Sequence, residues 1–158
     1  MSNKKINLFK KKEILFIKKR LKSTYVFNKN YIVPDNKSML TDNNQSYTKS
    51  AVLCLLNPNL ENNTYDIILT ERSKQLRSHA GQISFPGGKL DQIDSEDFKK
   101  CAYREAIEEI GFIPNDSIYL GMLNKYITGT GYLIQPIVAL SKTEQCFKLN
   151  NNEVTRIL

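Results

Sequence analysis

Three glutamates, Glu105, Glu108 and Glu109, lie close together near the middle of the chain. On a helix, residues three and four apart are neighbours, so the three carboxylates should fall within an arc of about 100° on two adjacent turns. Carboxylates this close repel one another unless a positive charge lies among them. A hard divalent cation such as Mg²⁺, which takes oxygen ligands and bridges to substrate phosphates, would supply that charge. Taken alone, the run also suits a solvated acidic helix face, and both interpretations are open at this point.

The residues on either side of the glutamates predict where their helix begins and ends. Gly111 is typical of the position just past a helix, and Pro114 would prevent its continuation. Three acidic residues suit the helix N-terminus, where carboxylates cap free amides and complement the dipole: Asp94, Glu96 and Asp97. We therefore predict a helix over residues 95–110. Four apolar side chains on it should face a core: Ala102, Ala106, Ile107 and Ile110.

Paired glycines precede this helix and let the backbone approach a ligand or metal closely. The glycines and the helix together resemble the Nudix box, Gly-x5-Glu-x7-Arg-Glu-U-x-Glu-Glu-x-Gly-U, where U is aliphatic or bulky. The matching residues are Gly88, Glu96, Arg104, Glu105, Glu108, Glu109, Gly111 and Phe112. There is one departure from the pattern. Seven residues separate Gly88 from Glu96, where the pattern has five.

Residues 69–88 resemble a second motif, the signature of the coenzyme A pyrophosphatase branch of Nudix hydrolases, roughly L-T-x-R-S-x3-R-x3-G-x3-F-P-G-G. The matching residues are Leu69, Thr70, Arg72, Ser73, Arg77, Gly81, Phe85, Pro86, Gly87 and Gly88. Members of this branch often carry a longer Gly-to-Glu loop, as residues 87–94 do here. The resemblance covers about residues 51–153.

The resemblance implies hydrolysis of the pyrophosphate bond of coenzyme A or its derivatives, giving adenosine 3′,5′-bisphosphate and 4′-phosphopantetheine. Mg²⁺ or Mn²⁺ would be the cofactor and a small-molecule nucleotide the substrate. We expect Glu105 and Glu109 to be the first metal ligands, because they lie one turn apart. Glu108 is a further ligand or the base that orients water, and the carbonyl of Gly88 is an additional candidate ligand. Hydrolysis of ADP-ribose or a dinucleotide, and nucleotide binding without turnover, are the alternatives.

Several charged residues have candidate supporting roles. Arg104 should pair with an acidic side chain, which by family analogy is Glu96, although Glu96 equally suits a dipole partner in the first helical turn. Arg72 and Arg77 are candidates for binding anionic substrate, because guanidinium groups match phosphate oxygens.

Other interpretations of the residues in this region remain. Surface ion pairs with Glu71 or Asp66 are the structural alternative for the two arginines. His79, the single histidine, is a hydrogen-bonding loop residue or a catalytic base. Glu153 is a further, weaker candidate base.

The apolar pattern predicts strands on both sides of the glutamate helix. They cover residues 51–56, 65–71, 83–85, 119–127 and 132–140. Loops are expected at residues 57–59 and 128–131. Strands that alternate with one strong helix indicate an α/β fold, and the resemblance implies a Nudix-fold α/β/α sandwich with a mixed β-sheet. In that family a further strand and a helix usually follow a segment like 152–154. Because the sequence stops at Leu158, we expect a fold truncated at its C-terminus.

The positive charge is concentrated at the N-terminus. The formal net charge is +7, but residues 1–22 hold nine Lys or Arg and one Glu, whereas residues 23–158 hold fourteen basic and fifteen acidic residues. We therefore predict a basic helical arm at 1–33, a linker at 34–50 and a Nudix hydrolase domain at 51–158. A docking helix or solvated arm is favoured over an anionic partner. No nucleic-acid partner is expected, because aromatic residues are not interleaved for base stacking.

The remaining composition is typical of a cytoplasmic protein. The sequence contains no run of eighteen apolar residues, so no membrane span is predicted. The lysine-rich start does not fit a signal peptide. Cys54, Cys101 and Cys146 are odd in number and lack CxxC spacing, which suits free thiols in a reducing compartment. The sequence does not indicate the oligomeric state.

Overall fold

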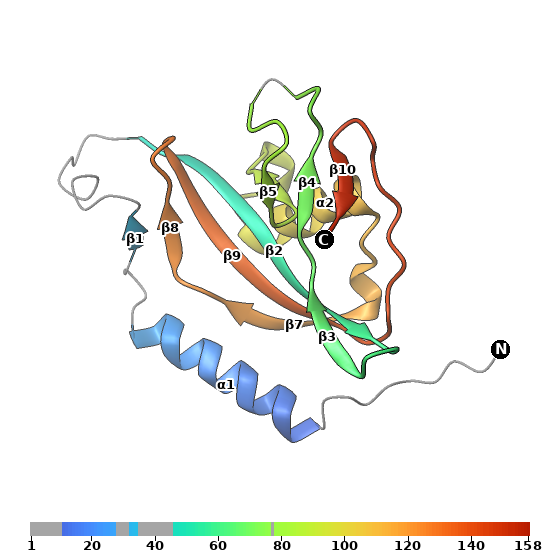
Figure 1. Cartoon of the computed structure of the whole chain (residues 1–158). Coiled ribbons are helices and arrows are strands. Elements are labelled where there is room, and N and C mark those ends of the chain that lie inside the picture. Colours follow the sequence, from blue (N-terminus) through green and yellow to red (C-terminus); the bar gives the residue numbers. More distant parts are fainter. Residues whose placement is uncertain (1–10, 28–31, 35–45, 77) are drawn as a thin grey trace.

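The structure is a computed structural model and describes residues 11–27, 32–34, 46–76 and 78–158. Within these residues, seven strands form a curled mixed sheet (Figure 1). Its centre is the parallel pair β2 (Thr48–Asn59) and β9 (Tyr132–Ser141). Both central strands are rich in apolar residues, as strands covered on both faces are.

The other strands of this sheet extend the central pair. Beyond β9 lie β8 (Lys125–Ile127) and β1 (Ile32–Pro34), and beyond β2 lies β3 (Thr64–Ile67). Two further strands pair with the free stretches of the central strands: β6 (Gly87–Lys89) with β2, and β7 (Ser117–Met122) with β9.

A second, antiparallel sheet consists of β10 (Val154–Ile157), β4 (Thr70–Arg72) and β5 (Ile83–Ser84). The prediction of one strand over residues 65–71 is therefore wrong. The chain leaves the large sheet after Ile68, whose amide donates to Leu55. It then joins the small sheet at Leu69, which exchanges two backbone hydrogen bonds with Leu158.

Two helices cover opposite faces of the large sheet, α1 (Lys11–Phe27) and α2 (Phe98–Ile110) (Figure 1). Alternate residues of a strand point to opposite faces. Along β2, Ala51, Leu53 and Leu55 belong to the core under α2, whereas Cys54 and Leu56 belong to the cluster under α1. This arrangement confirms the predicted α/β/α sandwich with a mixed sheet.

Helix α1 packs on the sheet through three apolar residues. Ile14, Ile17 and Leu21 lie against a cluster of Leu120, Val138 and Leu140. At Gly121 of β7 an added Cβ would lie 2.9 Å from the Cβ of Leu21, so the glycine allows the helix to approach the strand. The basic segment therefore contains a docked helix.

Helix α2 begins three residues later than predicted. Ser95 and Glu96 have left-handed φ values of 54° and 62°, which a right-handed helix does not tolerate. The carboxylate of Asp97 then accepts hydrogen bonds from the amides of Lys99 and Lys100 and caps the helix. The helix ends as predicted at Gly111, with φ 68°. The exposed side chain of Ile107 is a correction to the predicted apolar stripe.

Other boundaries also differ from prediction. Residues 57–59 are not a loop but the end of β2, paired with β3. Pro58 is tolerated there because the pairing of β2 with β9 ends at Leu56. The predicted strand 119–127 divides into β7 and β8. Strand β2 begins at Thr48, inside the predicted linker, whose residues 35–45 lie outside the described residues.

The expected loss of the strand after residues 152–154 is wrong, because β10 occupies that place. Two short 3-10 helices, η2 (Gln92–Asp94) and η3 (Pro114–Asp116), flank α2. None of the helices in the described residues has the length and apolar character needed to cross a membrane.

Replacing Leu21 with alanine should lower the free energy of unfolding by about 1–2 kcal/mol, because a partly buried leucine loses its contacts with β7. The matched control is Leu15→Ala on the same helix, where the side chain is 57% exposed and the change should stay below about 0.5 kcal/mol. Urea denaturation followed by circular dichroism measures both. Equal effects would contradict the packing of α1 on β7.

Candidate active site

The glutamate helix lies directly beside the glycine strand β6. The amide of Gly87 donates to Glu109 Oε2 at 3.0 Å. A Cβ added at Gly88 would lie 2.4 to 2.6 Å from three carboxyl atoms of Glu105. Only a residue without a side chain fits there while Glu105 keeps this position. The two halves of the predicted Nudix box therefore meet through Glu105 and Glu109.

Glu109 is a buried carboxylate at the centre of the site, with only 2% of its surface exposed. Its partners are the amide of Gly87 and the guanidinium of Arg72, whose Nη1 lies 3.5 Å from Oε1. The pKa of Glu109 is raised to about 7, chiefly by burial and to a smaller extent by the charges of Glu105 and Glu153, because Gly87 and Arg72 only partly offset the burial. The charged form of Glu109 is therefore only partly compensated by its two partners.

A buried ion pair fixes the neighbouring part of the helix. Arg104 donates from Nη2 to Asp94 Oδ2 at 2.8 Å and from Nε to Asp94 Oδ1 at 3.1 Å. Asp94 is fully buried, and its pKa is lowered chiefly by the hydrogen bond from Arg104. The same arginine donates from Nη1 to Glu105 at 2.8 Å and to Glu108 at 3.3 Å. Arg104 thus joins the loop before the helix to two of the three glutamates.

The acidic partner of Arg104 is Asp94 and not Glu96, which corrects the assignment by family analogy. Glu96 is exposed and pairs instead with Lys49. Five residues separate Gly88 from Asp94 in the sequence, which is the spacing that the Nudix pattern gives its first acidic residue. The two extra residues of this chain therefore fall after that acid, at the left-handed Ser95 and Glu96.

The three glutamates differ in their surroundings. Glu108 is the most exposed, with 52% of its side-chain surface accessible. Glu105 is mostly buried, and burial raises its pKa. As they stand, no three Asp, Glu, His or Cys side chains of the described residues converge to hold a metal ion. The carboxylates of Glu105 and Glu109 are instead engaged by Arg104, Gly87 and Arg72.

The donor chemistry nevertheless fits a hard divalent cation. Glu105 and Glu109 offer oxygen ligands, and burial raises the pKa of each, so a further positive charge beside them would stabilise their ionised forms. The Gly88 carbonyl, the other candidate ligand, lies 3.6 Å from Cys101 Sγ. These groups are the candidate metal ligands.

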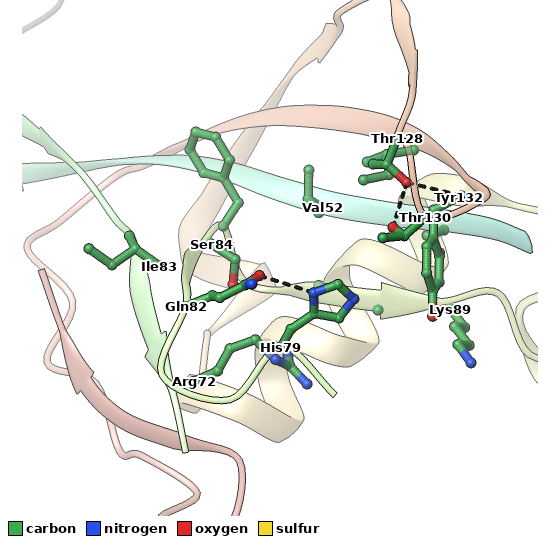
Figure 2. Close-up of a pocket in the computed structure, with 15 residues that line it drawn as sticks. Val52, Arg72, His79, Gln82, Ile83, Ser84, Lys89, Thr128, Thr130 and Tyr132 are labelled. Carbon is green, nitrogen blue, oxygen red and sulfur yellow. Dashed lines mark hydrogen bonds between the residues drawn. The ribbon is translucent and has the colours of Figure 1, made fainter. Parts of the chain in front are cut away.

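A cavity of about 420 Å³ opens beside these residues (Figure 2). Its wall includes Arg72, both glycines of β6 and a set of polar and aromatic side chains: Ser50, His79, Gln82, Lys89, Thr128, Thr130 and Tyr132. Two buried atoms on this wall, Arg72 Nε and Ser50 Oγ, have no hydrogen-bond partner in the described part of the chain. Arg72 therefore retains donor capacity toward the cavity.

The remaining predicted residues divide into three cases. Arg72 bonds to neither Glu71 nor Asp66 among the recorded contacts, since Glu71 pairs with Arg156 and Asp66 with Asn59. His79 is a hydrogen-bonding loop residue, with Nδ1 3.0 Å from Gln82 Oε1. Arg77 lies outside the described residues, and its substrate-binding role remains a prediction.

The structure also adds a residue that the sequence indicated only weakly. Backbone hydrogen bonds join the segment of Glu153 to the site: Asn150 donates to the Glu109 carbonyl, and Ser73 donates to the Glu153 carbonyl. The charge of Glu153 makes a small contribution to the raised pKa of both Glu105 and Glu109. These long-range bonds leave no short motif in the sequence.

The chain belongs to the Nudix family, because the Nudix domain profile matches residues 47–154. Over 92 residues it is 41% identical to the peroxisomal coenzyme A diphosphatase ndx-8 of Caenorhabditis elegans, covering 58% of this chain and 39% of that protein. Over 94 residues it is 37% identical to the Nudix hydrolase NudL of Pectobacterium atrosepticum, covering 60% of this chain and 48% of NudL. The chain thus spans less than half the length of these relatives.

Solved structures support the same fold. A Nudix hydrolase of Mycobacterium smegmatis, RenU, superposes with a TM-score of 0.58 at 17% identity and covers 72% of this chain and 70% of its own. The ndx-8 relative is peroxisomal, so the predicted cytoplasmic location of this chain stays a prediction.

Replacing Asp94 with asparagine should lower the free energy of unfolding by about 2–3 kcal/mol, because the guanidinium of Arg104 loses the buried carboxylate that neutralises its charge. Glu96→Gln, the matched control two residues away, should change it by less than about 0.5 kcal/mol, since it breaks only an exposed pair. Chemical denaturation at pH 7 measures both. A larger effect at Glu96 would restore the assignment by family analogy.

Replacing Glu109 with glutamine should stabilise the metal-free protein at pH 8 by about 2–3 kcal/mol, because each unit of pKa shift corresponds to about 1.4 kcal/mol. A buried carboxyl with a raised pKa favours the folded state at low pH. That contribution is lost as pH rises from about 4.5 through about 7. The gain of the variant should therefore disappear near pH 4.5.

Thermal unfolding in excess chelator between pH 4.5 and 8 measures this gain. Glu61→Gln, at an exposed glutamate in the turn after β2, is the control and should leave the curve unchanged. A gain that does not depend on pH would contradict the raised pKa.

Proposed function

We propose that this protein is a metal-dependent pyrophosphohydrolase that cleaves the diphosphate of coenzyme A or its derivatives. Water attacks one phosphorus atom of the diphosphate, and the bridging P–O bond breaks. The products are adenosine 3′,5′-bisphosphate and 4′-phosphopantetheine. Membership of the Nudix family and the coenzyme A diphosphatase named among the relatives support this proposal.

One contact carries the argument. Arg72 of the coenzyme A signature lies on the wall of the cavity. Its Nη1 is 3.5 Å from Oε1 of Glu109 in the Nudix box. Two motifs found separately in the sequence therefore share one site. Nη1 of Arg72 faces the carboxylate while its Nε is unpaired in the described structure. A diphosphate bound here would meet a guanidinium with unused donors next to the candidate metal ligands.

The carboxylates have distinct proposed roles. Mg²⁺ or Mn²⁺, when bound, would neutralise charge on the diphosphate and polarise its P–O bonds. Glu105 and Glu109 would hold this cation, with the Gly88 carbonyl as a further ligand. Glu108, which is half exposed, would add a ligand or orient the attacking water. Arg104 would position Glu105 and Glu108, as its hydrogen bonds to both indicate.

Product analysis tests this function. Purified protein is incubated with coenzyme A, ADP-ribose and diadenosine polyphosphate, with chelator or with Mg²⁺ or Mn²⁺, and the products are separated by chromatography. We expect coenzyme A to be cleaved to the two named products in the presence of metal only. Glu109→Gln should lower kcat by about 100-fold or more, because charge stabilisation in the transition state is lost.

Glu61→Gln, which removes an exposed carboxylate outside the site, is the matched control and should keep the wild-type rate. Coenzyme A that stays intact while another substrate is cleaved would overturn the substrate assignment. A full rate for Glu109→Gln would overturn its assignment as a metal ligand.

A further inference from the structure

A second positive charge lies on the wall of the cavity, at Lys89. This residue ends β6, directly after Gly88, and its ammonium is 5.6 Å from the centroid of the Tyr132 ring. Figure 2 shows Lys89 beside Tyr132, whereas Arg72 enters from the side of Gln82, with the His79 ring between them in this view. The two cations therefore contribute to different parts of the wall.

Lys89 and Arg72 also differ in their partners. Arg72 faces the carboxylate of Glu109. Lys89 is exposed and takes part in none of the ion pairs found among the described residues. Within the described residues, its ammonium lies against the aromatic face of Tyr132, which does not neutralise its charge as a carboxylate would. A cation on a cavity wall without a carboxylate partner is suited to bind an anionic group of a ligand.

The surroundings of Lys89 are held in place by local bonds. His79 lies edge-on to Tyr132, with ring centroids 6.3 Å apart, and its Nδ1 is tied to Gln82. The Tyr132 amide donates to Thr128 Oγ1, which in turn is 3.0 Å from Thr130 Oγ1. Aromatic side chains and hydroxyls on one wall suit a nucleoside next to a phosphate.

The proposed substrate has two anionic groups that are separated in the molecule. Its diphosphate is the reacting group, and a 3′-phosphate sits on the ribose of the same nucleotide. If the diphosphate lies against Arg72 and the glutamates, the 3′-phosphate must reach another part of the wall. A compact ammonium binds a phosphate dianion as a point charge without strict geometry.

We propose that Lys89, held beside Tyr132, binds the 3′-phosphate of the substrate. The protein thereby selects adenosine diphosphate derivatives phosphorylated at the 3′ position over those with a free 3′-hydroxyl. This inference rests on the function proposed above and adds a specificity-determining residue to it. Lys89 acts on substrate choice and not on the bond that breaks.

Kinetics with a matched pair of substrates test the inference. Coenzyme A and 3′-dephospho-coenzyme A differ only in the 3′-phosphate, and each is assayed with saturating metal. The variants are Lys89→Met, which removes the charge but keeps an unbranched apolar chain, and Lys89→Arg, which keeps the charge. For Lys89→Met we expect kcat/KM to fall about tenfold on coenzyme A, mainly through KM, and less than about twofold on the dephosphorylated substrate.

Two controls separate this effect from a general loss of charge. Lys49→Met removes a positive charge from the adjacent strand β2, at a lysine paired with Glu96 and outside the cavity wall, and should leave the preference unchanged. Lys89→Arg should retain most of it. An equal fall on both substrates, or no fall on either, would overturn the inference.

The two proposals fail in different ways. Wild-type protein that cleaves ADP-ribose but neither coenzyme A form would overturn the proposed substrate. Thermal stabilisation by the two coenzyme A forms then tests Lys89 without turnover. We expect coenzyme A to raise the Tm of wild-type protein more than the dephosphorylated form, and Lys89→Met to abolish the difference. Equal stabilisation of wild-type protein by both ligands would overturn the inference.

Discussion

The buried ion pair between Asp94 and Arg104 is the constraint on which the rest of the site depends. A buried charge is tolerated only when it is neutralised and hydrogen-bonded. Asp94 and Glu105 neutralise the charge of Arg104, and its guanidinium donates hydrogen bonds to both and to the carbonyl of Lys89. These contacts tie three segments together: the 3-10 turn η2, the helix α2 and the strand β6. The position of the carboxylates over the glycine strand follows from that connection.

The same pair shows what the sequence could and could not predict. The glutamate helix, its end at Gly111 and the central strands followed from periodicity and from residues with strong local preferences. The partner of Arg104 could not be predicted in this way, because the longer loop offers two acids, Asp94 and Glu96. A linear pattern does not indicate where in the loop the two extra residues are accommodated. The structure places them at Ser95 and Glu96, both left-handed, so that Asp94 keeps the spacing from Gly88.

Long-range backbone pairing accounts for the other differences. Residues 65–71 have the composition of one strand, but their partners belong to two sheets, since β3 bonds β2 and β4 bonds β10. The late segment that supplies β10 also covers the end of α2, where Lys148 and Asn150 donate to the carbonyls of Ile110 and Glu109. Nothing local in either segment encodes its partner, so tertiary context decides.

The arrangement around Glu109 is unfavourable for stability. Glu109, a buried carboxylate, has its pKa raised to about 7, and the nearby guanidinium of Arg72 does not offset this burial. A fold selected for stability alone would place an apolar side chain there. Perturbed titratable groups of this kind cluster where chemistry requires them. This unfavourable burial lies next to the cavity. On the cavity wall, Nε of Arg72 is an unused donor and Lys89 lacks an acidic partner among the described residues. The acidic side chains of α2 are therefore joined through Arg72 to a cavity wall that carries two cations, and a metal ion together with a polyanionic ligand would complement both.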